Sequence, residues 1–564
     1  MNERSQCFPS PEQGCLIERA GAKESLLIVA GPGTGKSRTA LAIALQKIRS
    51  LPSTSLSRVL FLSFSNATIR RLAVSAGMQF SASERKHLKF MTFHSCAADL
   101  LSHYGRFVGL PYPTMVADKL QERLLAIEAE HDEEGEGYWG FLMSLAKNKG
   151  LLAFSVLLPL ASRILSASKT LRRVVSRHYP LIVVDEFQDT SEEQWRFLQV
   201  LGAESQVVTF GDPNQIIYSS LHQATERRLG EFEAWKNTAA DLSLARNFRC
   251  SQKAILEFAD CLLHGRPFEI NDSDPVKFAA VYRTQLRVRL ALLWKQIQDK
   301  IGSGQTIGIL LPSNKLVEDV ATSLRNPPED SPIRFPVYAQ LARDEAAYDA
   351  VLLALAGIKD FTSQPSKGLA RRAAVALLAM NSSWDSRSRS SREKISEVAD
   401  RLVCHSEGEG TAIGRLCTSL GSGQPLSYSV PALIEALEEL PAFKRAAKRL
   451  TAHPAIAVRS LCHVQPSLPL FDQFLANRTP KGLEGDDVFE GKTHVINYHK
   501  AKGREFDYLV LVVDPREEST KTPLAEKRRL YYVAATRARK WLGVIFFGAE
   551  RGPVLGPALV RPHS

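Results

Sequence analysis

Cysteine is scarce in this chain, and no two cysteines have the spacing of a metal site. Eight cysteines occur among 564 residues, and none belongs to a Cys-x-x-Cys pair. Cys404 and Cys462 each precede a histidine, but adjacent residues lack ligand spacing, so ordinary buried thiols are the better interpretation. A zinc or iron–sulfur centre is therefore not expected, and the low cysteine content fits a reducing cytoplasm.

Long hydrophobic runs are also missing. The most apolar stretch, Leu151–Leu165, contains Pro159 and Arg163 and is too short to span a bilayer, so we expect it to form a buried pair of helices. Residues Met1–Gln6 have no apolar core and do not predict a signal peptide. We therefore expect no association with a membrane, and a cytoplasmic location.

Acidic residues are outnumbered by basic ones. The formal net charge is +12, and the isoelectric point is about 9.2. This balance favours polyanionic partners such as nucleic acid, although many basic proteins bind none. With 564 residues and 44% hydrophobic content, the chain can bury several cores, so three or four domains are expected.

Two sets of strand-like runs alternate with helical patterns, which predicts an α/β fold with parallel sheets. The first set comprises Leu26–Val29, Val59–Ser63, Lys89–Phe93, Leu181–Val184 and Val207–Phe210. The second set comprises Ile307–Leu311, Val495–Tyr498, Tyr508–Val513 and Trp541–Phe547. A long helical section interrupts each set. The four expected parts are residues 1–96 with 180–245, residues 97–179, residues 246–341 with 492–564, and residues 342–491.

A glycine-rich loop follows the first strand-like run and leads into a helical pattern at residues 39–48. It consists of Ala30, Gly31, Pro32, Gly33, Thr34, Gly35, Lys36 and Ser37. Such a loop turns backbone N–H groups inward onto a phosphate, and the helix N-terminus adds positive potential. Lys36 would reach the β- and γ-phosphates, and Ser37 would ligand Mg²⁺. A chance turn is the alternative, but the complete strand–loop–helix context favours binding of ATP with Mg²⁺.

The strand-like run at residues 181–184 ends in two adjacent acids, Asp185 and Glu186. Asp185 can hold Mg²⁺ and Glu186 can polarise a water molecule, a pairing that suits nucleotide hydrolysis. An ordinary acidic turn is the alternative for the two acids alone. The tail Phe187–Ser191 adds more than such a turn needs.

These motifs and several others occur in the order found in UvrD/Rep-like superfamily 1 DNA helicases, which the chain resembles from Gln13 to Arg537. The other motifs are Phe61–Thr68, Thr92–His94, Gly211–Tyr218, Asn247–Arg249, His499–Phe506 and Tyr531–Ala538. The resemblance implies two RecA-like P-loop lobes with parallel sheets, each carrying a helical insertion subdomain.

The resemblance also implies roles at the nucleotide. The catalytic set would be Lys36, Asp185, Glu186, Gln215, Arg249 and Arg537, the last three lying at the γ-phosphate. The remaining nucleotide contacts would be Gln13 at the adenine edge, Arg38 beside the nucleotide, Phe248 on the adenine ring and Glu505 at the ribose. Outside its motif, Gln13 would be a surface residue, and each arginine would be a surface ion-pair partner.

Single-stranded DNA is the other ligand that the resemblance implies. Its contacts would be Phe64, Asn66, Thr92, His94, Tyr218 and His499. Phe64 is suited to stacking on a base, with core packing as its alternative.

Three departures from the family pattern concern DNA unwinding. Ser220 stands where the family usually has a tryptophan that stacks on a base, a contact worth roughly 1–3 kcal/mol. Pro312 stands where the family often has arginine, and no strand-separating aromatic is evident after Arg537. Duplex separation is therefore less strongly indicated than ATP hydrolysis.

The sequence thus predicts an ATP-dependent DNA translocase or helicase that binds single-stranded or tailed DNA, with the 3′→5′ polarity usual in the family. One alternative is a DNA- or nucleotide-sensing ATPase subunit of an anti-phage defence complex, resembling the helicase-like subunit of Gabija, with an OLD-family nuclease as partner. A nucleotide-binding scaffold without turnover is disfavoured because Lys36, Asp185, Glu186 and Arg537 are all present.

Overall fold

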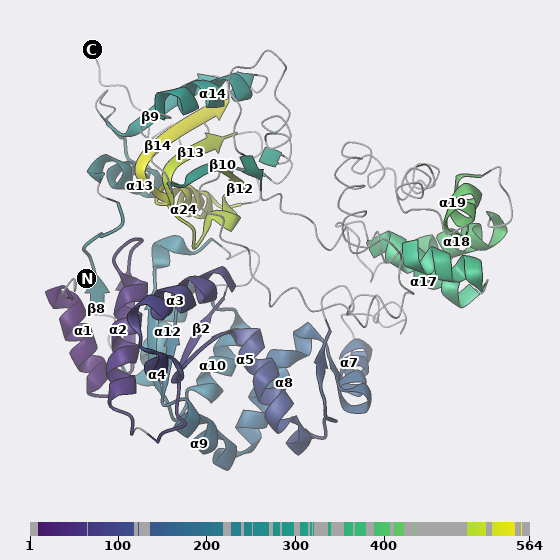
Figure 1. Ribbon diagram of the computed structural model, residues 1–564, viewed down its shortest axis with the longest axis horizontal. Coiled ribbons are helices and arrows are strands. Elements are labelled where there is room, and N and C mark those ends of the chain that lie inside the picture. The colour runs from purple at the N-terminus through teal and green to yellow at the C-terminus, as the bar shows by residue number, and fades with distance from the viewer. Residues whose placement is uncertain are drawn as a thin grey trace. The chain divides into compact units, whose positions relative to one another are not determined.

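The computed structural model contains two six-stranded sheets with helices packed around them (Figure 1). It describes residues 9–52, 54–64, 66–117, 122, 136–217, 227–238, 242–250, 252–269, 274–282, 285–297, 305–313, 316–317, 320, 337–339, 355–364, 367–379, 389–405, 411–421, 435, 493–514, 522–547 and 554. The chain forms two compact units, one of residues 1–99, 158–341 and 485–564, the other of residues 100–157 and 342–484. Both six-stranded sheets belong to the first unit.

The first sheet has the strand order β3-β2-β6-β7-β1-β8, and all neighbouring strands are parallel. Its strands are β1 (Leu26–Ala30), β2 (Val59–Ser63), β3 (Leu88–Thr92), β6 (Leu181–Val184), β7 (Gln206–Gly211) and β8 (Leu242–Leu244). All but β8 coincide with predicted runs to within one residue at either end. The sequence Leu-Ser-Leu of β8 is too short to show a pattern.

Burial on both faces explains why these strands read as continuous apolar runs. Helices α1 (Pro11–Gly21), α2 (Lys36–Arg49) and α3 (Asn66–Gln79) share one core cluster with the sheet. Members of that cluster include Leu16, Ile28, Leu41, Phe61 and Leu72. The other elements in this part are α4 (Ala82–Arg85), α5 (Phe93–Tyr104), α8 (Phe154–Ala167), α9 (Lys169–His178), η2 (Phe187–Asp189), α10 (Glu192–Leu201), η3 (Pro213–Gln215) and α12 (Arg228–Lys236).

The second sheet has the order β11-β12-β10-β13-β14-β9 and is also parallel throughout. Its strands are β9 (Val276–Val281), β10 (Ile307–Leu311), β11 (Val337–Ala339), β12 (Thr493–Asn497), β13 (Phe506–Val513) and β14 (Ala538–Phe547). The predicted α/β class with two parallel sheets is therefore confirmed. The sequence did not predict β9 or β11, because β11 is very short and β9 contains two alanines and a lysine.

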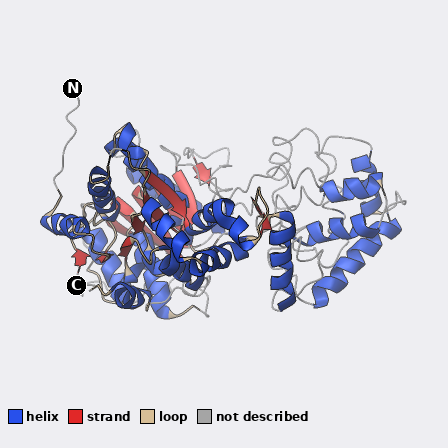
Figure 2. Ribbon diagram, turned by 90° about the horizontal axis from the view of Figure 1, so that it is seen from below, coloured by secondary structure: helices blue, strands red, loops and turns tan. Residues whose placement is uncertain are grey.

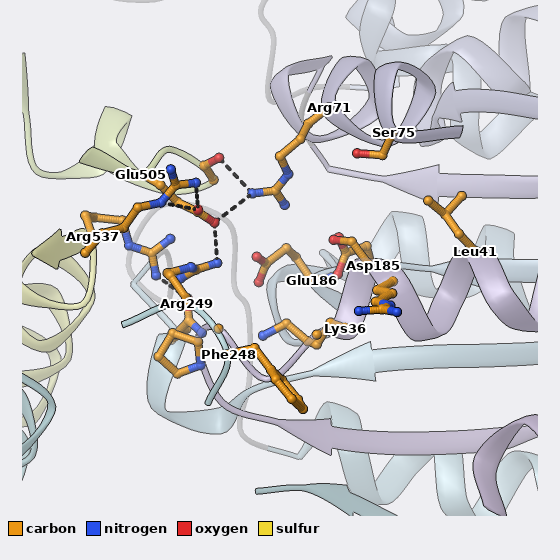
Figure 3. A pocket seen from close by; sticks show the side chains of 18 of the residues that line it. Lys36, Leu41, Arg71, Ser75, Asp185, Glu186, Phe248, Arg249, Glu505 and Arg537 are labelled. Carbon is orange, nitrogen blue, oxygen red and sulfur yellow. Dashed lines mark hydrogen bonds and ion pairs between the residues drawn. The ribbon is translucent and has the colours of Figure 1, made fainter. Parts of the chain in front are cut away.

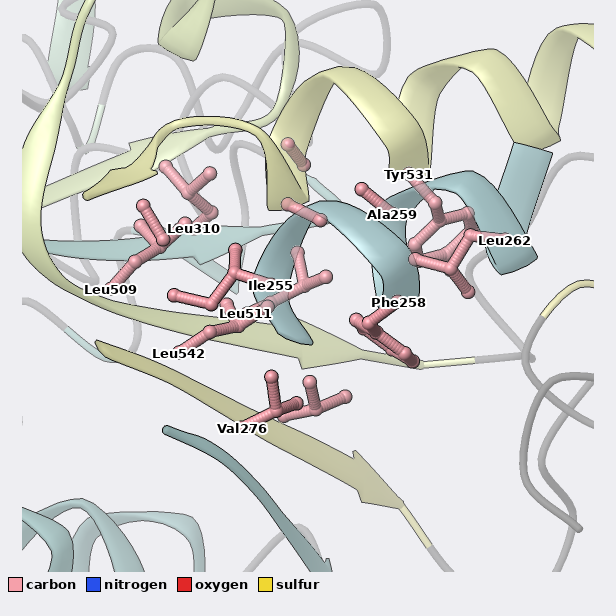
Figure 4. Close-up of a cluster of buried hydrophobic side chains, with 14 of the residues drawn as sticks. Ile255, Phe258, Ala259, Leu262, Val276, Leu310, Leu509, Leu511, Tyr531 and Leu542 are labelled. Atoms are coloured by element: carbon pink, nitrogen blue, oxygen red, sulfur yellow. The ribbon is translucent and has the colours of Figure 1, made fainter. Parts of the chain in front are cut away.

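Helices cover both faces of the second sheet (Figure 1), and Figure 2 shows strands surrounded by helices in another view. Helices α13 (Lys253–His264) and α24 (Leu524–Ala535) pack on one face, and α14 (Leu286–Ile297) packs on the other. Figure 4 shows the first of these cores, where Phe258 and Leu262 of α13 lie against strand residues such as Leu511 and Leu542.

The second compact unit contains mainly helices in its described residues. Its elements are η1 (Gly105–Val108), α7 (Glu136–Lys149), α17 (Lys367–Ala379), α18 (Arg389–His405), α19 (Ala412–Gly421), and the parallel pair β4 (Met115–Val116) and β5 (Leu151–Leu152). The predicted boundaries of the four parts remain a prediction.

The expected pair of helices at Leu151–Leu165 is wrong. Residues Leu151 and Leu152 form β5, and one helix, α8, then continues through Pro159. Proline lacks an N–H and disfavours a helix interior. Here the burial of apolar side chains such as Leu157 and Leu165 along α8 offsets that cost. Within the part of the chain that the structure describes, no helix is long and apolar enough to cross a membrane.

Replacing Phe258 by alanine tests the core of the second sheet. The ring is fully buried and packs edge-on against Phe268 and Phe278, with centroids 5.3 Å away in each case. We expect Phe258→Ala to lower the free energy of unfolding by about 3–5 kcal/mol, measured by denaturant titration. Tyr282→Ala is the control, because that ring is 71% exposed. Equal losses in the two variants would contradict this packing.

Candidate active site

Loops after β1, β6 and β7 of the first sheet and residues just before or at the start of β13 and β14 of the second sheet border one cavity of about 610 Å³ (Figure 3). The predicted site residues that line it are Pro32, Gly33, Gly35, Lys36, Ser37, Arg38, Asp185, Glu186, Gln215, Phe248, Arg249, Glu505 and Arg537. The structure therefore brings together all six predicted catalytic residues. Ala30, Gly31, Thr34 and Gln13 adjoin this cavity without lining it.

The glycine-rich loop owes its shape to two left-handed residues. Gly33 has φ +78° and Gly35 has φ +87°, conformations that side chains disfavour. A Cβ on Gly33 would also lie 2.6 Å from Cβ of Arg249. Lys36 begins α2, and its Nζ donates to the carbonyl oxygens of Ala30 at 2.8 Å and Gly31 at 3.2 Å. These bonds hold the ammonium group at the loop.

The two acids occupy the end of β6. The N–H of Asp185 donates to Leu62 O at 3.0 Å, which extends the strand ladder by one bond. Glu186 has φ +53°, a left-handed conformation that costs about 1–3 kcal/mol in a residue other than glycine. Its carboxylate accepts a hydrogen bond from Gln188 Nε2 at 2.7 Å. The sharp turn and this bond fix the direction of the Glu186 side chain.

The pKa values of the two acids shift in opposite directions. Burial, and then the adjoining charge of Glu186, raises the pKa of Asp185. Burial alone would raise the pKa of Glu186 as well, but Lys502, Lys36 and the Gln188 hydrogen bond lower it to about 2. The Glu186 carboxylate is therefore ionised at neutral pH. Burial and the charge of Arg249 lower the pKa of Arg537 to about 10, so this guanidinium keeps its charge at neutral pH.

Arg537 joins the two sheets. The residue precedes β14, and its Nη2 donates to Gln215 Oε1 at 3.1 Å, while its Nε donates to Val533 O at 2.9 Å. Gln215 ends η3, the short helix that follows β7 of the first sheet. Its Nε2 donates to Asp212 Oδ2 at 2.7 Å. The predicted γ-phosphate residues Gln215 and Arg537 are thus in direct contact across the cavity.

Glu505 lies among three arginines, two of which, Arg71 and Arg249, are labelled in Figure 3. Its Oε1 is 2.6 Å from Arg249 Nη2 and 3.8 Å from Arg71 Nη1, and Arg539 donates to Oε2. Burial would raise the pKa of Glu505, but Arg249 and Arg539 lower it to about 2. Arg71 belongs to α3 and also donates to Gly503 O at 3.0 Å, so it links the first sheet to the second.

Phe248 and Gln13 flank the glycine-rich loop. The N–H of Phe248 donates to Gly33 O at 2.7 Å, and the residue, which is 49% exposed, lines the cavity. Gln13 is buried, and its side-chain amide lies beside Gly35. Its Oε1 accepts a hydrogen bond from the N–H of Ser10 as part of the N-terminal cap of α1. The alternative of a surface position for Gln13 is therefore wrong.

Among the described residues, the predicted DNA contacts Phe64, Thr92, His94 and His499 do not line the cavity. Phe64 follows β2, Thr92 ends β3, and His94 lies in the first turn of α5, so the three share one edge of the first sheet. The Thr92 hydroxyl lies 2.8 Å from Ser95 Oγ. His499 follows β12 of the second sheet. Tyr218 and the side chain of Asn66 lie outside the described residues.

Several charged or polar neighbours of the site were not predicted. Lys502 and Gln188 stand inside recognised motifs, and that position was their only sequence signal. Arg71 and Arg539 carried none, because their contacts depend on the approach of two distant segments.

Oxygen donors at the cavity suit Mg²⁺. The Ser37 hydroxyl and the Asp185 carboxylate both line it, and hard oxygen ligands are those that Mg²⁺ prefers. Among the described residues, no group of three or more His, Cys, Asp or Glu side chains could hold a metal ion by itself. Ser37 and Asp185 would supply two ligands, and Mg²⁺ usually takes the remainder from phosphates and water.

Comparison with known proteins agrees with this geometry. The UvrD/REP helicase N-terminal domain matches residues 11–137 and 118–233, and the UvrD-like helicase C-terminal domain matches residues 492–545. The chain belongs to the UvrD-like family of superfamily 1 helicases. The matched ranges include the glycine-rich loop, the two acids and Arg537.

Individual relatives of this UvrD-like chain include DNA helicase II of Escherichia coli, 22% identical over 94% of the chain and 84% of the relative. The ATP-dependent DNA helicase srs2 of Schizosaccharomyces pombe is 26% identical over 41% of the chain and 32% of its own length. The RecBCD enzyme subunit RecB of Buchnera aphidicola is 33% identical, but the match covers only 14% of the chain and 7% of that protein.

The pKa of Glu505 predicts a pH-dependent contribution to stability. Because its pKa falls from 4.5 unfolded to about 2 folded, its ion pairs stabilise the protein above pH 4.5, and this stabilisation is lost as the pH falls towards 2. We expect Glu505→Gln to lower the thermal unfolding midpoint at pH 7. The gap from wild type should narrow below pH 4.5. A gap that stays constant between pH 7 and pH 3 would contradict this origin.

Proposed function

We propose that the chain is an ATP-dependent DNA helicase or translocase that hydrolyses ATP in the cavity between its two sheets. One observation carries the proposal: the acids of the first sheet and the arginines Arg249 and Arg537 line the same cavity. Cleaving a phosphoanhydride needs an oriented water molecule and positive charge around the transferring group, and these residues supply both. The names of the relatives, which are DNA helicases, support the same proposal.

In this proposal the first sheet holds the phosphates. Backbone N–H groups of the loop Ala30–Ser37 surround the β-phosphate, and Lys36 moves from its two carbonyl partners to the β- and γ-oxygens. Ser37 and Asp185 would hold Mg²⁺, whose charge would polarise the phosphoryl oxygens and stabilise the negative charge of the transition state. Glu186, ionised and fixed by its turn, orients and polarises the attacking water.

The second sheet completes the site by adding positive charge. Arg537 already contacts Gln215, so the two can approach the γ-phosphate together. Arg249 exchanges its Glu505 partner for the γ-phosphate, which frees one Glu505 oxygen for the ribose hydroxyls. Phe248 stacks on the adenine, with Gln13 at the adenine edge and Arg38 beside the nucleotide. Arginines supplied in this way neutralise the charge of the transferring phosphoryl group.

We further propose that single-stranded DNA lies across the strand ends that carry Phe64, Thr92 and His94. The other proposed contacts are Asn66, Tyr218 and His499. Repeated closing and opening of the two sheets around ATP would move the strand, with 3′→5′ polarity.

A second candidate function is a sensor that hydrolyses ATP with little unwinding, as part of an anti-phage defence complex with a nuclease. One observation favours it: Ser220 replaces a residue that stacks on DNA in the family. Losing such a contact weakens the binding free energy for a base by roughly 1–3 kcal/mol.

ATP turnover with and without single-stranded DNA tests the main proposal. We expect DNA to stimulate turnover of the wild type. We expect Glu186→Gln to lose at least about a hundredfold in kcat, because the variant keeps the shape of the side chain without its charge. Absence of DNA stimulation, together with full activity of Glu186→Gln, would refute the proposal.

Strand displacement separates the two candidate functions. The helicase proposal predicts displacement of a duplex that carries a 3′ single-stranded tail and little displacement of a 5′-tailed one. DNA-stimulated ATP turnover without displacement of either duplex would favour the sensor. Displacement of the 5′-tailed duplex alone would contradict the proposed polarity.

A further inference from the structure

A chain of hydrogen bonds runs from Glu186 through the first sheet to the second. Gln188 Nε2 donates to Glu186 Oε2 at 2.7 Å, and Gln188 Oε1 accepts from the N–H of Asp212 at 3.0 Å. Asp212 Oδ2 in turn accepts from Gln215 Nε2 at 2.7 Å. The carboxylate proposed to orient water is therefore connected to the residue that contacts Arg537.

Lys502 closes this chain into a ring from the opposite sheet. The residue follows η7 (His499–Ala501), and its Nζ donates to Gln215 O at 2.7 Å and pairs with the Asp189 carboxylate. The N–H of Asp189 donates to Glu186 O at 3.0 Å. One ammonium group thus holds both the turn that bears Glu186 and the loop that bears Gln215.

The ion pair of Lys502 with Asp189 is deeply buried. The Lys502 side chain is 9% exposed and the Asp189 side chain 1%. Asp189 Oδ1 is also buried and accepts no hydrogen bond from the described residues, so this carboxylate depends strongly on Lys502. If the two loops separated, water would hydrate both charged groups again. The free energy of a buried ion pair is often close to that of its two ions in water. The contact therefore has a defined geometry but can break and re-form at a small cost in free energy, as a switch between two states requires.

We propose that Lys502 is a positioning residue through which closure of the second sheet sets Glu186 and Gln215 for hydrolysis. The inference rests on the proposed function. The position of Lys502 explains how DNA would act on the site: it lies three residues after His499, and it holds Gln215, three residues before Tyr218. DNA bound to those two residues would keep the two loops together and preserve the Lys502 contacts.

A double-mutant cycle on Lys502→Met and Asp189→Asn tests this inference, with ATP turnover measured with and without single-stranded DNA. Methionine keeps the length of lysine without its charge. We expect each single variant to lose about tenfold in DNA-stimulated kcat, while KM for ATP changes by less than about threefold. The double variant should lose little more than Lys502→Met alone, because Lys502→Met has already removed the ion pair that Asp189→Asn breaks.

Lys236→Met is the matched control. Lys236 is also partly buried, and its Nζ donates to the carbonyl oxygens of Gly202 at 2.6 Å and Ser205 at 3.1 Å, away from the cavity. We expect this variant to have a lower unfolding midpoint and unchanged stimulation by DNA. Thermal unfolding of all variants shows whether any loss of activity reflects unfolding.

The outcomes separate the inference from the function on which it rests. A wild type that does not hydrolyse ATP, or that DNA does not stimulate, refutes the function. A stimulated wild type with equally stimulated Lys502→Met refutes the inference alone. So does a double variant whose loss is about a hundredfold, the product of two independent effects. A loss of stimulation in Lys236→Met as large as that in Lys502→Met also overturns it.

Discussion

The contact between the Arg537 guanidinium and the Gln215 amide joins two sheets that otherwise have separate cores. Each sheet buries its own apolar residues and needs nothing from the other to do so. The cavity between them, by contrast, is lined by charged groups from both. Apolar burial therefore builds the two halves, and polar contacts at the strand ends determine how the halves meet.

This separation of apolar cores from polar contacts suits the proposed opening and closing of the site. An apolar interface of similar extent would hold the halves together strongly, whereas buried charged contacts come close to balancing their cost of desolvation. Glu505 is an example of such a contact, because it forms ion pairs with Arg249 and Arg539. A bound nucleotide could take its place beside Arg249. The left-handed backbone conformation of Glu186 is strained, and the hydrogen bond from Gln188 helps to stabilise it.

Local features of the site were predictable from the sequence, and contacts between the sheets were not. The glycine-rich loop and the two acids follow buried strands directly, so apolar runs and chain order suffice to place them. Glu505 and Arg249 were expected at the nucleotide, but their ion pair with each other was not. Arg71 contacts Gly503 across more than four hundred residues of chain, and no spacing rule in a single sequence encodes such a pair. Short strands such as β8 were missed for a simpler reason, since three residues show no period.

In the proposed function, hydrolysis requires positive charge from the second sheet beside an acid of the first. Single-turnover hydrolysis of ATP already bound to the Arg537→Ala variant, with saturating single-stranded DNA, tests it most directly. We expect the binding of ATP to change by less than about tenfold, while the rate of hydrolysis falls by about a thousandfold or more, the range for arginines that stabilise phosphoryl transfer. A variant that binds ATP and hydrolyses it at the wild-type rate would show that the charge of Arg537 is not required.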